Sequence, residues 1–229
     1  TEEKRVKEIV MPNLHWVRDI MTQYYGKNSN IYEVLEANSV HELYLKNVDK
    51  VFDVNYTFYD PFFLLDKSKP TIHLSSSEYP EENKYDCCFL FDSIDRSSDP
   101  FDLINITFNS LKPGGICFIT CLLSSGFEAQ SLGKESNIFF PPEKMNLFSF
   151  EGIKKLICEF HNFEIIEFST PSLLDIENVM LNLNMSESNR FIKYMLSDRD
   201  DWEIKQSFSD FLQHNRLGSF ARIAIKKNP

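Results

Sequence analysis

Two short apolar runs limit the possible folds of this chain more than any other feature of its sequence. They occupy residues 87–91 and 116–121, and both are continuous and rich in aromatic or β-branched residues. Such runs are typical of strands that are buried on both faces of a parallel sheet. The segment between them, residues 100–111, begins with a proline and carries apolar residues at helical spacing before Pro113-Gly114-Gly115. The sequence therefore predicts a β-α-β unit.

The chain before this unit predicts N-terminal helices within residues 1–26, with Gly26 as the stop of the last helix. A sheet is expected to start after this glycine. Its predicted elements are a strand at 30–35, a helix at 40–46, a strand at 50–54 that ends near Asp53, and a weak strand at 71–74.

The chain after this unit begins with a connection, residues 124–146, that is longer than two neighbouring elements need. We interpret it as a lid or a substrate-facing insertion, because binding residues often lie on such loops. The remaining predicted elements are a helix at 150–160 with Ser149 as its N-cap, a strand at 163–168, a helical addition within 173–214, and a final strand at 219–225.

Helices and strands alternate along the whole chain, and no repeat or linker divides it. This order predicts a doubly wound α/β sheet in a single domain that covers residues 1–229. A length of 229 residues with 42% hydrophobic residues is sufficient for a sizeable core.

The net charge of −10 argues against nucleic acid or an anionic membrane as the main partner. No apolar run approaches the roughly 20 residues that a membrane span requires, and the first residues are not a secretory signal. The five cysteines lie mostly inside predicted strands and have no zinc-like spacing. We therefore expect buried thiols in a reducing compartment, a cytoplasmic protein, and no metal site.

Several motifs in this order resemble those of a known family. Tyr85-Asp86, the polar segment 91–100 and Leu111-Lys112-Pro113-Gly114-Gly115 resemble the middle of class I S-adenosylmethionine-dependent methyltransferases. Gly126-Phe127-Glu128 and Asn146-Leu147-Phe148 are similar to a branch found among bacterial and archaeal surface-polysaccharide genes. The resemblance covers nearly the whole chain. It implies a Rossmann-like, doubly wound, mostly parallel seven-stranded sheet with an antiparallel last strand and added N-terminal helices.

The resemblance also implies where the cofactor S-adenosylmethionine binds. Family members hold its methionine half with a glycine-rich turn after the first strand, which here is the glycine-free segment 33–39. An acid at the end of the second strand holds the ribose hydroxyls in the family. That acid is Asp53 here, for which an ordinary strand-end or capping role is the alternative. The candidate cofactor-binding residues are Glu33, Leu35, Ala37, Ser39, Asp53 and Asp92.

The sequence departs from the family pattern at two places that face the methyl acceptor in the family. Asp95-Arg96 stands where relatives typically carry Glu-His, and Glu143-Lys144 stands where they carry a histidine. Histidine suits a general base because its pKa lies near neutrality, whereas arginine stays protonated. Asp95 and Glu143 are therefore the candidate catalytic residues.

Two functions follow from these observations. The first is an active enzyme that transfers a methyl group from S-adenosylmethionine to a hydroxyl or amine of a small molecule or sugar. The second is a catalytically inactive methyltransferase-fold protein that serves as a binding or assembly partner, because leucine, alanine and serine replace the glycines of the cofactor turn. A protein partner or a homo-oligomer is compatible with either function.

Overall fold

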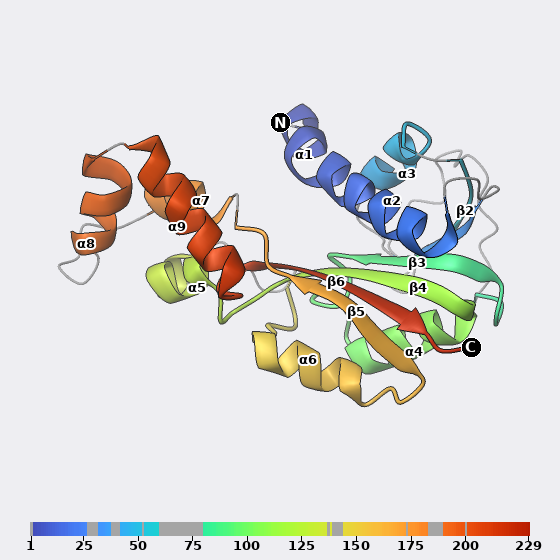
Figure 1. The fold of residues 1–229 in the computed structure, drawn as a ribbon. Helices are drawn as coiled ribbons and strands as arrows, with labels where there is room; N and C mark the ends of the chain where they lie inside the picture. The colour runs from blue at the N-terminus through green and yellow to red at the C-terminus, as the bar shows by residue number, and fades with distance from the viewer. Residues whose placement is uncertain are drawn as a thin grey trace, which may run out of the picture.

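A computed structural model gives the fold of the chain, and it describes residues 2–26, 32–37, 42–51, 53–59, 80–136, 138, 144–172, 174–182, 190–199 and 201–229. Figure 1 shows a central sheet with helices on both of its faces and a further group of helices at one end.

The six strands of the described residues form one sheet in the order β2-β1-β3-β4-β6-β5. The pairs β1–β2, β1–β3 and β3–β4 are parallel, whereas β6 is antiparallel to both β4 and β5. The strands are β1 (Tyr32–Ala37), β2 (Val54–Tyr59), β3 (Tyr85–Phe91), β4 (Leu111–Leu122), β5 (Phe163–Ser169) and β6 (Phe220–Lys227).

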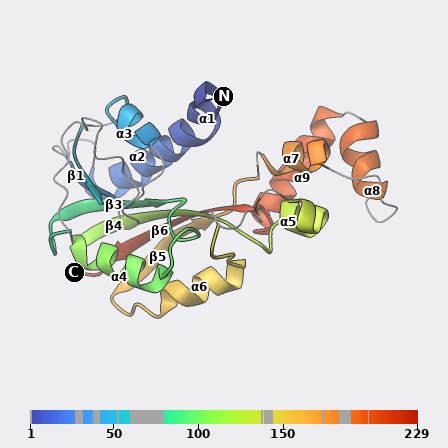
Figure 2. The same ribbon diagram turned by 180° about the vertical axis from the view of Figure 1, so that it is seen from behind.

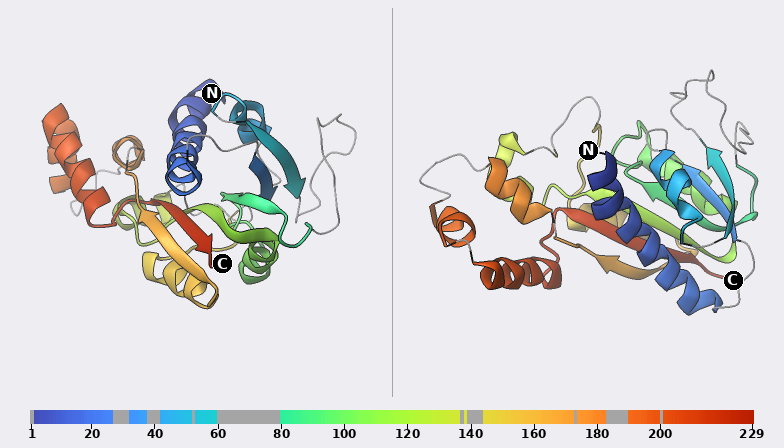
Figure 3. Two further views of the ribbon diagram at one scale, coloured as in Figure 1. Left: turned by 45° about the vertical axis from the view of Figure 1, so that its right-hand side comes forward. Right: turned by 90° about the horizontal axis from the view of Figure 1, so that it is seen from above.

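One face of the sheet is covered by the N-terminal helices and by the helix after β1, as Figure 2 shows from behind. These elements are α1 (Glu2–Arg5), the π-helical turn η1 (Val6–Val10), α2 (Met11–Tyr25) and α3 (Glu42–Val48). In the view from above in Figure 3, α2 lies across the sheet. The ring of Trp16 packs edge-on against Phe118 of β4, with 5.2 Å between the ring centroids.

The opposite face packs against α4 (Pro100–Ser110) and α6 (Phe150–Cys158). Its core contains Leu103, Ile104 and Phe108 of α4 together with Ile153 and Ile157 of α6, all buried. Because alternate residues of each strand point to opposite faces, the buried strands contribute to two cores, one under each helical layer.

The remaining helices gather beyond the end of β4 (Figures 1 and 2). They are α5 (Phe127–Leu132), the 3₁₀ turn η2 (Gly133–Glu135), α7 (Asp175–Asn182), α8 (Arg190–Lys193), the π-helical turn η4 (Tyr194–Asp198) and α9 (Trp202–His214). We call this set the helical group. A buried hydrogen bond of 2.8 Å from the Ser172 hydroxyl to the Ser209 carbonyl joins the start of α7 to α9.

The starts of the helices follow from local sequence. The carboxylate of Asp99 accepts a hydrogen bond of 2.9 Å from the backbone N–H of Asp102, so it caps α4, and Pro100 occupies the first turn. Ser149 caps α6 in the same way through Gly152, at 3.0 Å. These caps explain why the sequence patterns located both helices.

The predicted fold is confirmed: the sheet is doubly wound, mostly parallel, and has an antiparallel last strand. The number of strands differs from the prediction, because the described residues form six strands rather than seven. The strand expected at 71–74 lies outside the described residues.

The long connection predicted at residues 124–146 contains helical structure in its first half, which forms α5 and η2. The backbone N–H of Phe127 donates to the Leu217 carbonyl at 2.7 Å, and the Glu128 carboxylate accepts a hydrogen bond of 2.9 Å from Asn178 of α7. Tertiary contacts with the helical group therefore stabilise this segment as a helix.

Candidate functional site

The parallel strands β1, β3 and β4 end on the same side of the sheet, which we call the carboxyl edge. Asp92 follows β3 there and has a φ of 51°, a left-handed conformation that aspartate tolerates better than most residues. Its backbone N–H donates to the carbonyl and to the hydroxyl of Thr120, both at 3.1 Å. The turn at the end of β3 is therefore fixed to β4, with the half-buried carboxylate of Asp92 at the edge.

Asp95 lies one turn further on, and its carboxylate forms an ion pair with the ammonium of Lys144. Only 1% of the Asp95 side chain and 9% of the Lys144 side chain are exposed. The Oδ1 atom of Asp95 is buried and has no hydrogen-bond donor within the described part of the chain. The structure thus places a buried carboxylate with one unused oxygen beside the carboxyl edge.

Burial raises the pKa of Asp95, because a charged carboxylate is poorly solvated there. The positive charge of Lys144 opposes this shift, and the negative charge of Asp92 adds to it. The same environment raises the pKa of the buried thiol of Cys121 well above its ordinary value, through burial first and then the charges of Asp95 and Asp92. The three acidic groups therefore share one poorly solvated region.

Backbone hydrogen bonds join the segment at residues 144–146 to the loop that carries Asp95. The carbonyl of Asp95 accepts hydrogen bonds from the N–H groups of Met145, at 2.8 Å, and Asn146, at 2.9 Å. The side-chain amide of Asn146 donates to the Ser97 carbonyl at 2.5 Å. The segment that carries Lys144 is consequently docked on the loop between β3 and α4. Glu143, the other candidate catalytic residue, lies outside the described residues.

The cofactor turn predicted at residues 33–39 is partly strand. β1 continues through Ala37, and Leu35 is paired with Thr57 of β2 and with Cys88 of β3. The side chain of Leu35 is 0% exposed and belongs to the core on the α4 side of the sheet. The Leu35 side chain therefore packs between the sheet and α4. Ser39 lies outside the described residues.

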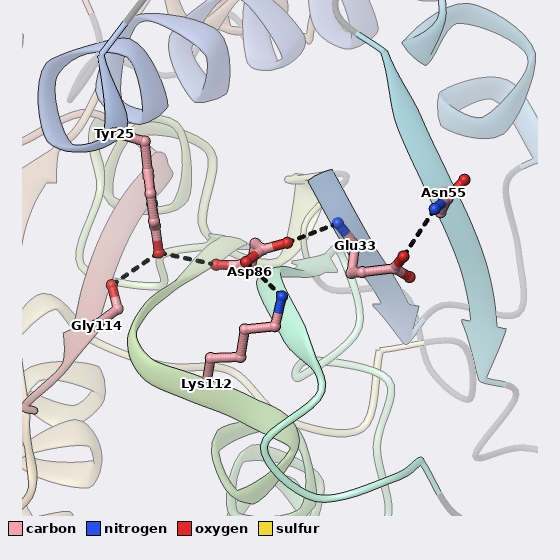
Figure 4. Close-up of polar contacts among 6 residues, drawn as sticks. All are labelled: Tyr25, Glu33, Asn55, Asp86, Lys112 and Gly114. Carbon is pink, nitrogen blue, oxygen red and sulfur yellow. Dashed lines mark hydrogen bonds and ion pairs between the residues drawn. The ribbon is translucent and has the colours of Figure 1, made fainter. Parts of the chain in front are cut away.

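Glu33 lies at the opposite edge of the sheet, near the start of β1 (Figure 4). Its carboxylate accepts a hydrogen bond of 2.7 Å from the Asn55 amide, and its backbone N–H donates to the Asp86 carboxylate at 2.8 Å. Asp86 also pairs with Lys112 at 2.7 Å. Ala37 is four positions after Glu33, which is about 13 Å along a strand. Glu33 thus joins β1 to its neighbours, away from the carboxyl edge.

The prediction that a strand at 50–54 ends near Asp53 is wrong. β2 begins at Val54, so Asp53 precedes the strand, and its carbonyl accepts a hydrogen bond of 3.3 Å from Tyr32 at the start of β1. Asp53 is exposed and lies on the amino side of the sheet. In the sequence the acid that directly follows β2 is Asp60, which is outside the described residues.

A further polar group at the carboxyl edge was missed by sequence reasoning. Arg222 of β6 pairs in register with Thr120, and its Nε donates to the Asn13 side-chain oxygen of α2 at 2.8 Å. Its guanidinium also lies over the ring of Trp16, 5.7 Å from the centroid. The sequence shows this site only as one arginine inside the apolar final strand. Its contact with α2 joins residues that are 209 positions apart, so no local pattern predicts it.

Neither a metal site nor a membrane-spanning helix is found among the described residues. No three of their histidine, cysteine, aspartate or glutamate side chains lie close enough together to hold a metal ion. No helix within the described ranges has the length and apolar character needed to cross a membrane.

Comparison with solved structures finds the same fold in several proteins. A candidate sarcosine dimethylglycine methyltransferase from Galdieria sulphuraria aligns with a TM-score of 0.60 and 14% identity, covering 97% of this chain and 88% of its own. The [4+2]-cyclase SpnF aligns with a TM-score of 0.56 and 14% identity, covering 93% and 80%. The plantazolicin methyltransferase BamL, solved with S-adenosylhomocysteine, aligns with a TM-score of 0.55 and 16% identity, covering 99% and 89%.

These identities support the fold alone. No curated protein matches the sequence. The sequence model of the family described as "Methyltransferase domain" matches residues 17–167, which include β1 to β4 and most of β5. This match covers more than half of the chain and includes the carboxyl edge with Asp92 and Asp95. The chain therefore belongs to the methyltransferase domain family.

Proposed function

We propose that this protein is an active S-adenosylmethionine-dependent methyltransferase that methylates a hydroxyl or amine of a small molecule or sugar at the carboxyl edge. The observation that carries the proposal is the fixed turn at Asp92, inside the segment that matches the family. A ligand at this edge would meet the ends of β1, β3 and β4 together, which is where α/β sheets bind ligands. Residues 1–229 would then act as one domain, with residues 173–214 as a helical addition.

The missing glycines do not contradict this proposal. Because Leu35 packs into the core, its side chain leaves the carboxyl edge accessible. We assign cofactor contacts to the segment that follows Ala37, including Ser39, and to Asp92. We also replace Asp53 by Asp60 as the acid for the ribose hydroxyls, because Asp60 follows the carboxyl end of β2 in the sequence.

Methyl transfer requires the protein mainly to align the acceptor with the methyl group. S-adenosylmethionine supplies an electrophilic methyl group when it is bound. The chain has to hold the acceptor in line with that methyl group and exclude water. We assign Asp95 as the acceptor of the proton from the nucleophile. It has an unused, buried oxygen, and burial raises its pKa toward the range in which a carboxylate is an effective base. Lys144 holds the carboxylate in place.

Cofactor binding can be measured directly. Titration with S-adenosylmethionine and S-adenosylhomocysteine, followed by calorimetry and by thermal unfolding, should show saturable binding. A stability gain of about 2.7 kcal/mol is expected at about a hundredfold excess over Kd. Asp60→Ala should weaken binding, and the matched variant Asp53→Ala should leave it unchanged. Absence of binding at millimolar ligand would refute the proposal.

A second candidate is a protein of this fold that binds a partner or small molecule without methyl transfer, for example as an assembly partner in a surface-polysaccharide pathway. It is favoured by β1, which continues as a paired strand through Ala37, where the family pattern has its glycine turn. The likeness to a [4+2]-cyclase supports it too, because one fold hosts different chemistries. Absence of cofactor binding would favour this candidate. Either function suits a cytoplasmic protein whose five thiols remain reduced.

A further inference from the structure

Arg222 lies at the carboxyl edge on the face of the sheet that α2 covers. In the register of the sheet it is level with Thr120 of β4 and with Ser169 at the end of β5. Thr120 is in turn the partner of Phe91, the last residue of β3. The arginine therefore lies level with the turn at Asp92, two strands away along the sheet, with β4 between them.

The guanidinium of Arg222 is held by a hydrogen bond at Nε, whereas its two terminal nitrogens have no hydrogen-bond acceptor among the described residues. Nε donates to Asn13 at 2.8 Å, and the fully buried Asn13 is itself fixed by a bond of 2.7 Å to the Tyr44 hydroxyl. Trp16 covers one face of the guanidinium. Within the described residues, the terminal nitrogens of Arg222 donate no hydrogen bond and no carboxylate lies within ion-pair distance of them.

A carboxylate does lie nearby, but other donors occupy it. The Oε1 atom of Glu167 accepts hydrogen bonds from the indole N–H of Trp16, at 2.9 Å, and from the Ser169 hydroxyl, at 3.0 Å. Glu167 contributes to the electrostatic environment of Arg222 without forming an ion pair with it. A mostly buried arginine that neutral groups hold in place can form a bidentate pair with an external anion.

We propose that Arg222 binds a carboxylate group of the acceptor, so that the substrate is a small carboxylic acid whose nucleophile reaches the edge beside Asp92. This inference rests on the proposed function, because it assigns the acceptor to the same edge.

A carboxylate matches this site better than a phosphate does. The two terminal nitrogens form a planar fork that pairs with the two oxygens of one carboxylate. A phosphate carries a charge of about −1.5 to −2 and usually requires more than one cation. Glu167 instead places a negative charge nearby, and Trp16 contributes an aromatic surface. Burial also lowers the pKa of Arg222, so a monoanion would offset the cost of desolvating the guanidinium.

The test observes the arginine itself. In protein labelled with ¹⁵N-arginine, the side-chain N–H signals of Arg222 are assigned by their loss in Arg222→Met. The labelled protein, saturated with S-adenosylhomocysteine, is titrated with acetate and benzoate, and separately with acetamide and benzamide at equal ionic strength. We expect saturable shifts of the Arg222 signals with the carboxylates and none with the amides. Equal responses to carboxylates and amides would overturn the proposal, and so would tighter binding of inorganic phosphate.

Variants give an independent readout. Arg222→Met should weaken benzoate binding by roughly tenfold or more, and Arg222→Lys should restore part of it. The control is Lys226→Met, which removes a cation from the same strand and the same face, over Tyr24. It should bind benzoate like the parent protein. Unchanged benzoate binding in Arg222→Met would refute the site, and the comparison of carboxylate with amide in the parent protein does not depend on how well this variant folds.

The proposed function and the carboxylate site can be tested separately. Calorimetry with S-adenosylmethionine reports the cofactor site, and Arg222→Met should leave that affinity unchanged. If the cofactor does not bind but Arg222 responds selectively to carboxylates in the free protein, the methyltransferase proposal fails and the carboxylate site stands. If the cofactor binds and the Arg222 signals do not respond, the acceptor inference alone fails.

Discussion

Asp95 and Lys144 are separated by 49 positions in the sequence, yet their side chains form an ion pair that is almost completely buried. The pair joins the loop after β3 to the segment before α6. A buried ion pair adds little net stability, because both charges lose water. Removing one partner is costly, because the other charge stays buried and unpaired.

We therefore expect Lys144→Met to destabilise the protein by about 3–5 kcal/mol at neutral pH. The variant should also raise the pKa of Asp95 further, since Lys144 lowers it. The double variant Asp95→Asn with Lys144→Met should recover most of the lost stability. Urea unfolding of the four proteins in this cycle measures the coupling. Strictly additive losses would show that the two charges act independently.

Gly218 provides a steric test of the junction between β6 and the helical group. A Cβ atom at this glycine would lie 2.4 Å from the backbone oxygen of Thr170, a contact that cannot be relieved by a side-chain movement. Gly218→Ala should thus cost at least about 1–3 kcal/mol in chemical denaturation.

Gly133→Ala is the comparison for this variant. A Cβ at Gly133 meets nothing within 4 Å, but the backbone has φ +53° and ψ −129°, a combination that residues other than glycine rarely adopt, so only backbone strain of about 1–3 kcal/mol is expected. A loss of less than about 0.5 kcal/mol in Gly218→Ala would contradict the close packing of Gly218 against Thr170.

The β-α-β unit was predictable because its signals are local. The apolar runs of β3 and β4 are continuous, and α4 carries its own N-cap in Asp99. Each of these features acts within a few residues, so the sequence pattern and the folded structure agree.

The register of β2 was not predictable from the same kind of pattern. Residues 50–54 contain two valines and a phenylalanine, whereas the paired strand is Val54–Tyr59. Pairing with β1 selects the second segment, and this choice moves Asp53 from the end of the strand to its start. A shift of a few residues in one boundary thus transfers a candidate ligand to the other edge of the sheet.

The contacts at the candidate site depend on tertiary structure and have no local signature. Lys144 reaches Asp95 only because the segment before α6 docks on the loop after β3. Arg222 meets Asn13 only because α2 lies across the sheet. Residue type can suggest that such side chains are candidates, but only the fold brings them together.

The cysteines allow a simple check of the core. Cys87, Cys88, Cys117 and Cys121 are buried, and burial raises the pKa of each of these thiols, whereas Cys158 is exposed. Because the thiolate is the reactive form, the native protein should show one fast-reacting thiol with a chromogenic disulfide reagent and five in guanidinium chloride. Cys158→Ser should abolish the fast phase. A second fast thiol in native protein would show that the β3–β4 core opens.

Asp175 predicts a pH dependence of stability. Its carboxylate is 3% exposed and accepts a hydrogen bond of 2.7 Å from the backbone N–H of Ser219, and burial raises its pKa to about 7. The negative charge of Glu128 adds to this shift. An unfolded aspartate titrates near pH 3.9, so between about pH 4 and 7 the folded state binds the extra proton. The free energy of unfolding should therefore fall as the pH rises through this range.

Asp175→Asn should remove this dependence, because an amide can still accept the bond from Ser219 but does not ionise. We expect the parent protein to lose on the order of 2–4 kcal/mol relative to Asp175→Asn between pH 4.5 and 8, measured by urea unfolding at several pH values. Glu177→Gln, an exposed change on the same helix, is the matched control and should follow the parent protein. Parallel pH profiles for the parent and Asp175→Asn would mean that Asp175 stays ionised in the folded state, which would require a cation or water beside it.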